Sequence, residues 1–185
     1  TEIYPLSLHD ALPICVDEAS RVPFIVMELL KGEDLYERVL RSGPLPLGEV
    51  VRVMMQVGHA LSRAHERSIV HRDVKPENVF LAATEAESGR RETAKLIDFG
   101  VAKLLHEGGP HTLPVGTPGY MAPEQATASA DITPATDVWA MGLLAFFAMT
   151  GVPYWRGGEQ ASLPYLIRQT CIDPLDPPSE RAREL

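Results

Sequence analysis

The stretch His71-Arg72-Asp73-Val74-Lys75-Pro76-Glu77-Asn78 decides the interpretation of this chain. It brings a carboxylate, an ammonium group and an amide together in one short segment, which we call the 71–78 loop. Phosphoryl transfer from a metal-bound nucleotide needs these groups, because it depends mainly on positioning and charge neutralisation. Carboxylate and amide oxygens are hard ligands, which suit Mg²⁺. Taken alone, the loop could also be a charged turn between a helix and a strand.

Two further motifs follow in order, Asp98-Phe99-Gly100 and Ala122-Pro123-Glu124. A charged turn does not explain them. The three motifs together resemble the signature set of the protein kinases. This resemblance implies an α+β, protein-kinase-like fold, consisting mainly of the helical large lobe with the hinge and the end of the small-lobe sheet.

The resemblance also implies chemical roles. Asp73 would accept or orient the proton of the substrate hydroxyl, and Lys75 would reach the transferred phosphate of ATP. Asn78 and Asp98 would hold Mg²⁺.

The substrate class follows from Lys75 and from Gly116-Thr117-Pro118-Gly119-Tyr120-Met121, which resemble the serine/threonine branch of the family. Thr117 would bridge Asp73 and Lys75, whereas the alternative is an ordinary turn hydroxyl. With Ala122-Pro123-Glu124-Gln125 added, the segment resembles the bacterial eukaryotic-like serine/threonine kinases most closely.

Other positions receive structural or regulatory roles from the resemblance. His71 would stack under Phe99, the residue before Gly100. Arg72 would pair with a phosphate on the activation loop, where Thr112 is the candidate phosphorylation site.

Two acidic residues would support this arrangement. Glu124 would pair with an arginine near the end of the large lobe, and Arg181 and Arg183 lie too early in the chain for that role. Asp137 would hydrogen-bond the backbone of the 71–78 loop, with a helix N-cap as an alternative or additional role.

Most of the residues that would contact the adenine of the nucleotide are expected before Lys31. Phe24-Ile25-Val26-Met27 is typical of a strand, and it leads into a segment that resembles the hinge between lobes. Met27 would be the gatekeeper of the adenine pocket as well as a core residue. The backbone of Glu28 and Leu30 would bind the adenine edge, and Phe80 would lie beneath the ring.

Apolar spacing predicts a helix over Leu47–Glu66, and a short helix is expected over Asp34–Leu40, bounded by Gly43 and Pro44. The segment that starts at Asp137 resembles the start of the buried central helix of the large lobe. Its apolar run, Val138 to Met149, is too short to cross a bilayer. Short strands are expected at 79–81 and 95–97. Residues 82–94 read as a solvated hairpin, and His59 and His65 as ordinary helix residues.

We hypothesise that residues 1–14 are not part of the natural protein. Residues 1–14 resemble a translated DNA-sequencing adapter, which must be set aside before the fold is considered. We expect residues 15–30 to end the small lobe and residues 31–185 to form a large lobe truncated before its C-terminal helices. The Gly-rich loop, strand lysine and helix glutamate of a kinase would lie upstream of Cys15, so we expect this chain itself to be inactive.

Composition indicates a globular protein with an acidic surface. Apolar residues make up 45% of the chain, charged residues 23%, and the net charge is −8. This balance argues against nucleic acid as the main partner. Cys15 and Cys171 have no metal-site or disulfide spacing, which favours the cytoplasm. An anchor elsewhere in the protein remains compatible with this.

Three function classes fit. The first is a serine/threonine protein kinase, which uses ATP and Mg²⁺ on protein substrates. The second is a pseudokinase scaffold, although Asp73, Asn78 and Asp98 are intact. The third is a small-molecule phosphotransferase of kinase-like fold, but such enzymes lack the segment from Thr117 to Glu124.

Overall fold

The computed structural model describes residues 14–16, 23–25, 28–86, 89–99, 116–127 and 132–185. The chain divides into two units, Thr1–Lys31 and Gly32–Leu185. In the first unit, β1 (Ile14–Val16) pairs antiparallel with β2 (Pro23–Ile25), and Ile14 lies opposite Ile25. The strand predicted at 24–27 therefore starts one residue earlier, while Met27 lies outside the described residues.

The second unit contains a three-stranded antiparallel sheet in the order β3 (Gly32–Asp34), β4 (Val79–Ala86) and β5 (Gly89–Leu96). Gly32 lies opposite Ala82 on β4. Gly32 has φ 149°, and an added Cβ would lie 2.1 Å from the Leu81 carbonyl oxygen, so only glycine fits at this close approach.

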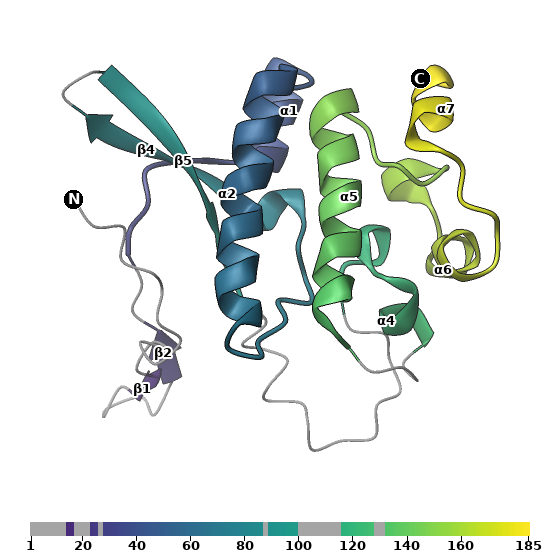
Figure 1. Ribbon diagram of the computed structural model, residues 1–185, viewed down its shortest axis with the longest axis horizontal. Coiled ribbons are helices and arrows are strands. Elements are labelled where there is room, and N and C mark those ends of the chain that lie inside the picture. Colours follow the sequence, from purple (N-terminus) through teal and green to yellow (C-terminus); the bar gives the residue numbers. More distant parts are fainter. Residues whose placement is uncertain (1–13, 17–22, 26–27, 87–88, 100–115, 128–131) are drawn as a thin grey trace. The chain divides into compact units, whose positions relative to one another are not determined.

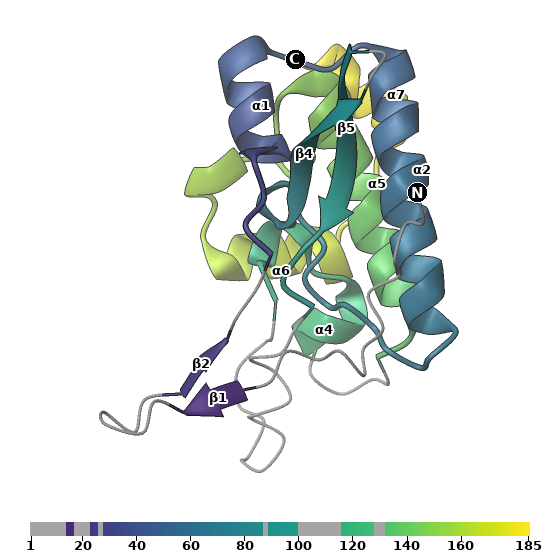
Figure 2. The same ribbon diagram turned by 90° about the vertical axis from the view of Figure 1, so that its left-hand side faces the viewer.

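The hairpin predicted at 82–94 is present, but it is not solvated throughout, and its strands are longer than the short ones predicted at 79–81 and 95–97. The β4–β5 ladder continues from Val79 opposite Leu96 to Ala86 opposite Gly89, and Ala82 and Ala94 are buried. The cause is tertiary contact, because the backbone N–H of Ala94 donates to Gln56 Oε1 at 2.7 Å. Figure 2 shows the hairpin with β5 facing α2 (Leu47–His65) and β4 facing α1 (Leu35–Ser42).

Helix α1 is set by its two caps. The Asp34 carboxylate accepts from the backbone N–H of Glu37 at 2.8 Å, and Gly43 ends the helix with φ 79°. The helix predicted over Asp34–Leu40 thus exists, but Asp34 is its N-cap and it runs on to Ser42.

Helices α2 and α5 (Pro134–Thr150) lie side by side and antiparallel (Figure 1). The prediction for α2 holds to within one residue at its C-terminus. Thr133 and Thr136 form a capping box at the start of α5, so the N-cap is Thr133 and the N-cap alternative for Asp137 was wrong. Gly151 ends α5 in the left-handed conformation.

The main core lies between these helices and the sheet. Because α2 repeats buried residues at three- and four-residue steps, one of its faces packs inward. The buried apolar residues of this core are Leu35, Val39, Leu45, Val50, Val53, Val57, Leu61, Val74, Val79, Leu81, Ala94, Leu96, Ala140, Leu144, Phe147 and Ala148.

A second, smaller core joins α5 to the C-terminal part of the chain. Trp155 is buried with Leu143 and Leu166, and its ring stacks against Trp139 with 6.3 Å between centroids. The indole N–H of Trp155 donates to the Gly119 carbonyl at 3.0 Å. This core thereby fixes η3 (Pro118–Tyr120) against α6 (Leu163–Cys171).

The remaining elements are short. They are η2 (Pro76–Asn78), α4 (Pro123–Thr127), η4 (Gly158–Gln160) and α7 (Pro178–Arg183). Helix α7 begins at Pro178. None of the helices that the structure describes is long and apolar enough to cross a membrane.

An arginine-centred ion cluster ties β3, α1, α2 and β5 together. Arg38 is 13% exposed and forms ion pairs with Glu33, Glu49 at 3.2 Å and Glu92 at 2.6 Å. Hydrogen bonds from Arg41 and Arg38 lower the pKa of Glu33 from 4.5 to about 2. The cluster compensates for the partial burial of Arg38, which would otherwise be costly.

Candidate active site

The 71–78 loop carries a chain of hydrogen bonds centred on Thr117. The Lys75 ammonium donates to Thr117 Oγ1 at 2.9 Å, and Thr117 Oγ1 donates to Asp73 Oδ1 at 2.9 Å. The direction is fixed because an ammonium group can only donate, so the single hydroxyl proton goes to the carboxylate. The backbone N–H of Thr117 also donates to Asp73 Oδ1 at 3.1 Å. Three predicted catalytic residues therefore lie together.

Asn78 fixes the other side of Asp73. Its Nδ2 donates to the Asp73 carbonyl at 2.8 Å and to Asp73 Oδ2 at 3.3 Å. Both bonds use the amide nitrogen, and no hydrogen bond of the described residues uses Asn78 Oδ1. The amide oxygen therefore remains available as a hard ligand, the kind that Mg²⁺ prefers.

Asp98 is exposed and has φ 57°, a conformation that non-glycine residues rarely adopt. Among the described residues, no group of three or more His, Cys, Asp or Glu side chains could hold a metal. Mg²⁺ sites in nucleotide enzymes commonly use one or two carboxylates together with substrate phosphates. Asp98 and the Asn78 amide oxygen fit such a site by their chemistry.

His71 packs beneath Phe99, with 4.7 Å between the ring centroids and a tilt of 56°. The backbone N–H of Asp73 donates to His71 Nδ1 at 3.3 Å, so Nδ1 is an acceptor. The proton then lies on Nε2, which donates to the Ile97 carbonyl at 3.0 Å. The fully buried imidazole thus links the 71–78 loop to Ile97, which lies between the end of β5 and Asp98.

Asp137 holds the start of the 71–78 loop. Its Oδ2 accepts from the His71 backbone N–H and its Oδ1 from that of Arg72, both at 2.9 Å. The backbone contact proposed from sequence is present. His65 Nε2 lies 2.7 Å from Asp137 Oδ2, so the interpretation of His65 as an ordinary helix residue was wrong. Its sequence spacing gave no signal, because the partner is far along the chain.

Two polar residues of α4, Glu124 and Gln125, form hydrogen bonds with other segments of the chain. Thr136 Oγ1 donates to Glu124 Oε1 at 2.6 Å, while Arg181 contacts the Tyr154 carbonyl and Glu184 instead. Gln125 contacts Arg72 through its amide group, a contact that sequence reasoning missed.

The other predicted site residues are only partly described. Met27, Gly100 and Thr112 lie outside the described residues. Glu28 and Leu30 belong to the first unit, which is described by itself. The Phe80 ring lies beside Gly32, because a Cβ on that glycine would be 3.1 Å from Phe80 Cε1.

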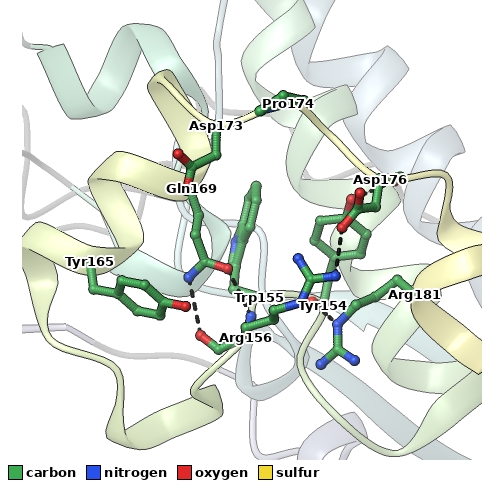
Figure 3. Close-up of a pocket in the computed structure, with 9 residues that line it drawn as sticks. All are labelled: Tyr154, Trp155, Arg156, Tyr165, Gln169, Asp173, Pro174, Asp176 and Arg181. Carbon is green, nitrogen blue, oxygen red and sulfur yellow. Dashed lines mark hydrogen bonds and ion pairs between the residues drawn. The ribbon is translucent and has the colours of Figure 1, made fainter. Parts of the chain in front are cut away.

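A small pocket between the α5–α6 segment and α7 contains none of the predicted site residues (Figure 3). Its charged groups form ion pairs, since Arg156 contacts Asp176, which also lines the pocket, at 2.7 Å and Glu184, which follows α7, at 2.6 Å. Gln169 exchanges two hydrogen bonds with the backbone of Arg156. These contacts anchor α7.

The family described as protein kinase domain matches residues 12–182. The chain belongs to the protein kinase family. Its expected fold class is thereby confirmed. Protein kinases generally use ATP and Mg²⁺ and act on protein substrates.

The similar proteins are bacterial serine/threonine kinases. The chain is 41% identical to the serine/threonine-protein kinase Pkn1 of Myxococcus xanthus, over 76% of this chain and 20% of that protein. It is 36% identical to pkn2 of the same organism, over 77% and 17%, and 33% identical to PknB of Mycobacterium leprae, over 88% and 25%. The expected likeness to bacterial eukaryotic-like serine/threonine kinases is confirmed. The kinase chain spans about a quarter or less of the length of these relatives.

Proposed function

We propose that the protein is a serine/threonine protein kinase, which transfers the γ-phosphate of ATP to serine or threonine hydroxyls of protein substrates. The hydrogen-bonded chain from Lys75 through Thr117 to Asp73 carries this proposal. It places a cation and a carboxylate on either side of one hydroxyl, beside the amide of Asn78.

Each of these residues has a task in the proposed reaction. Both carboxylate oxygens of Asp73 accept hydrogen bonds, which fix the orientation of the side chain. In this orientation Asp73 would orient the substrate hydroxyl and accept its proton. Lys75 would neutralise charge on the transferred phosphoryl group. Its hydrogen bond to Thr117 keeps the ammonium group near the carboxylate, with Nζ 3.5 Å from Asp73 Oδ2.

The metal and nucleotide contacts are part of the proposal. Asn78 and Asp98 would hold Mg²⁺, which offsets the negative charge of the phosphates. The backbone of Glu28 and Leu30 would bind the adenine edge, with Phe80 beneath the ring and Met27 behind it. Residues 15–30 would then end the small lobe, residues 31–185 would belong to the large lobe, and the catalytic domain would face the cytoplasm.

The supporting residues complete the proposal. His71 and Phe99 would keep Asp98 in place, next to Gly100. Arg72 would receive a phosphate carried by Thr112, and Asp137 and Glu124 would brace the 71–78 loop and the segment that ends in α4.

The test uses the protein expressed from its native gene, labelled ATP and a mixture of protein substrates. We expect phosphoserine and phosphothreonine, and a loss of about 10²–10⁴-fold in turnover for D73N. E66Q is the matched control, because Glu66 forms an exposed ion pair with Arg63 at the end of α2. Binding of ATP without any transfer would support a scaffold and contradict the proposal. Phosphotyrosine as the main product would contradict the substrate class.

A further inference from the structure

Gln125 on α4 is a buried polar residue, 6% exposed, whose two amide atoms bond in different directions. Its Oε1 accepts from the backbone N–H of Ala122, the residue just before α4, at 3.0 Å. Its Nε2 donates to the Arg72 carbonyl at 2.8 Å, across a gap of 53 positions in sequence. The first bond is a local cap, while the second joins α4 to the 71–78 loop.

The residue at the far end of this contact is conformationally unusual. Arg72 has φ 67°, in the left-handed region that costs a non-glycine residue free energy. Its backbone N–H is held by Asp137 Oδ1 at 2.9 Å, and its carbonyl oxygen is held by Gln125. A strained backbone conformation persists only where the surrounding structure fixes it. In Arg72, hydrogen bonds fix both the backbone N–H and the backbone carbonyl.

The surroundings of Gln125 leave little room for another arrangement. Gly116 has φ 142°, and a Cβ at this position would lie 3.1 Å from Gln125 Nε2 and 3.5 Å from the Arg72 carbonyl oxygen. The glycine therefore lets the segment that carries Thr117 pass close to the contact between Gln125 and Arg72. Thr117 donates hydrogen bonds to the Asp73 carboxylate, and Gln125 donates one to the carbonyl of Arg72, the residue before Asp73.

We propose that Gln125 is a positioning residue, which sets the direction of the Asp73 carboxylate by fixing the Arg72 carbonyl. The inference rests on the proposed kinase function, in which Asp73 is the catalytic group. The side-chain bonds described for Gln125 go to Ala122 and Arg72, and the proposed effect on Asp73 passes through the backbone of Arg72.

The chemistry needed at this position is a donor and an acceptor on one side chain. Glutamate keeps an acceptor for Ala122, but its carboxylate cannot donate to the Arg72 carbonyl. Methionine has nearly the same shape and provides neither bond. A comparison of Q125E with Q125M therefore separates the link to Arg72 from the local cap.

The experiment measures turnover and backbone hydrogen exchange in the protein expressed from its native gene. We expect both variants to lower kcat by about tenfold or more, because small displacements of catalytic groups cost one to two orders of magnitude. KM for ATP should change less than about twofold, since Gln125 provides no part of the proposed nucleotide contacts. Exchange at the Arg72 and Asp73 amides should become faster.

T127A is the matched control. Thr127 lies on the same helix, and its hydroxyl bonds only to the Pro123 and Glu124 carbonyls among the described contacts. Its kcat and exchange should stay near those of wild type, and circular dichroism should report a folded protein for all variants. If Q125E behaves like wild type and only Q125M is impaired, Gln125 is a helix cap and the inference is overturned.

The two proposals fail in different ways. A wild-type protein without transfer activity contradicts the kinase function, while faster exchange at Arg72 in Q125E would still support the positioning role. An active wild type whose kcat and exchange are both unchanged in Q125E contradicts the positioning role alone.

Discussion

The carboxylate of Asp137 holds the backbone of Arg72, with Oδ1 accepting its N–H at 2.9 Å. Asp137 is 1% exposed, and its second oxygen accepts from the backbone N–H of His71, the residue before Arg72. A buried carboxylate that accepts two backbone bonds combines the cost of burial with strong charge-assisted hydrogen bonds. Removing it would leave two donors without their partner, which is costly in a buried place.

We expect D137A to lower the free energy of unfolding by about 2–5 kcal/mol, because two buried N–H groups and His65 lose their acceptor. D137N should lose less, since its amide oxygen still satisfies one donor. Urea titration followed by circular dichroism measures the difference. D173N is the control, because Asp173 forms a surface pair with Arg168 that should contribute no more than about 1 kcal/mol.

The hydroxyl of Thr117 gives a second prediction. T117V removes the group between Lys75 and Asp73 and should lower kcat by about tenfold or more, whereas T117S keeps the hydroxyl and should remain within about threefold of wild type. Peptide phosphorylation by the protein from the native gene provides the measurement. Equal activity in the serine and valine variants would rule out the hydroxyl as the bridging element.

The ion cluster predicts an unequal response of two arginines. R38A leaves Glu33, Glu49 and Glu92 near one another without the central cation, and should cost about 2–4 kcal/mol of stability. R41A is the matched variant, because Arg41 contacts the same Glu33 but is 62% exposed, and it should lower the stability much less than R38A does. Urea midpoints that fall equally in both variants would argue against a central role for Arg38.

Glu33 predicts a dependence on pH. Its pKa is lowered from 4.5 to about 2 by hydrogen bonds from Arg41 and Arg38. The ionised carboxylate therefore stabilises the fold above pH 4.5, and this contribution disappears as the pH falls toward 2. We expect E33Q to be about 1 kcal/mol less stable than wild type near neutral pH. The gap between the two should narrow below about pH 4.5. A gap that stays constant down to pH 3 would contradict this assignment.

Much of the site could be predicted because its residues lie in short segments with recognisable order. The 71–78 loop, Asp98-Phe99 and the segment from Gly116 to Glu124 each carry their roles in local sequence, and the apolar spacing of α2 gave that helix to within a residue. The contacts that were missed join segments far apart. His65 contacts Asp137, and Gln125 contacts Arg72, only in the folded chain, because the partners lie far apart in the sequence.

The β4–β5 hairpin likewise depends on contacts between segments that are far apart in the sequence. Residues 82–94 are polar and read as solvated, yet the ladder persists because β5 packs on α2 and its Glu92 joins the Arg38 cluster. The polar sequence was compatible with a hairpin, but it did not predict the burial of Ala82 and Ala94 or the ion pair of Glu92. Such pairs depend on which faces the fold brings together, which local propensity does not encode.

The stacked pair Trp139 and Trp155 has a practical consequence for spectroscopy. These are the two tryptophans of the chain, and both belong to the smaller core, where Trp155 also bonds to the Gly119 carbonyl. Intrinsic tryptophan fluorescence therefore reports on one neighbourhood, where η3 rests on α5 and α6. A loosening of that neighbourhood would change emission while the α2–β5 half of the core stays intact, so a fluorescence transition that precedes the loss of helical signal would identify where unfolding begins.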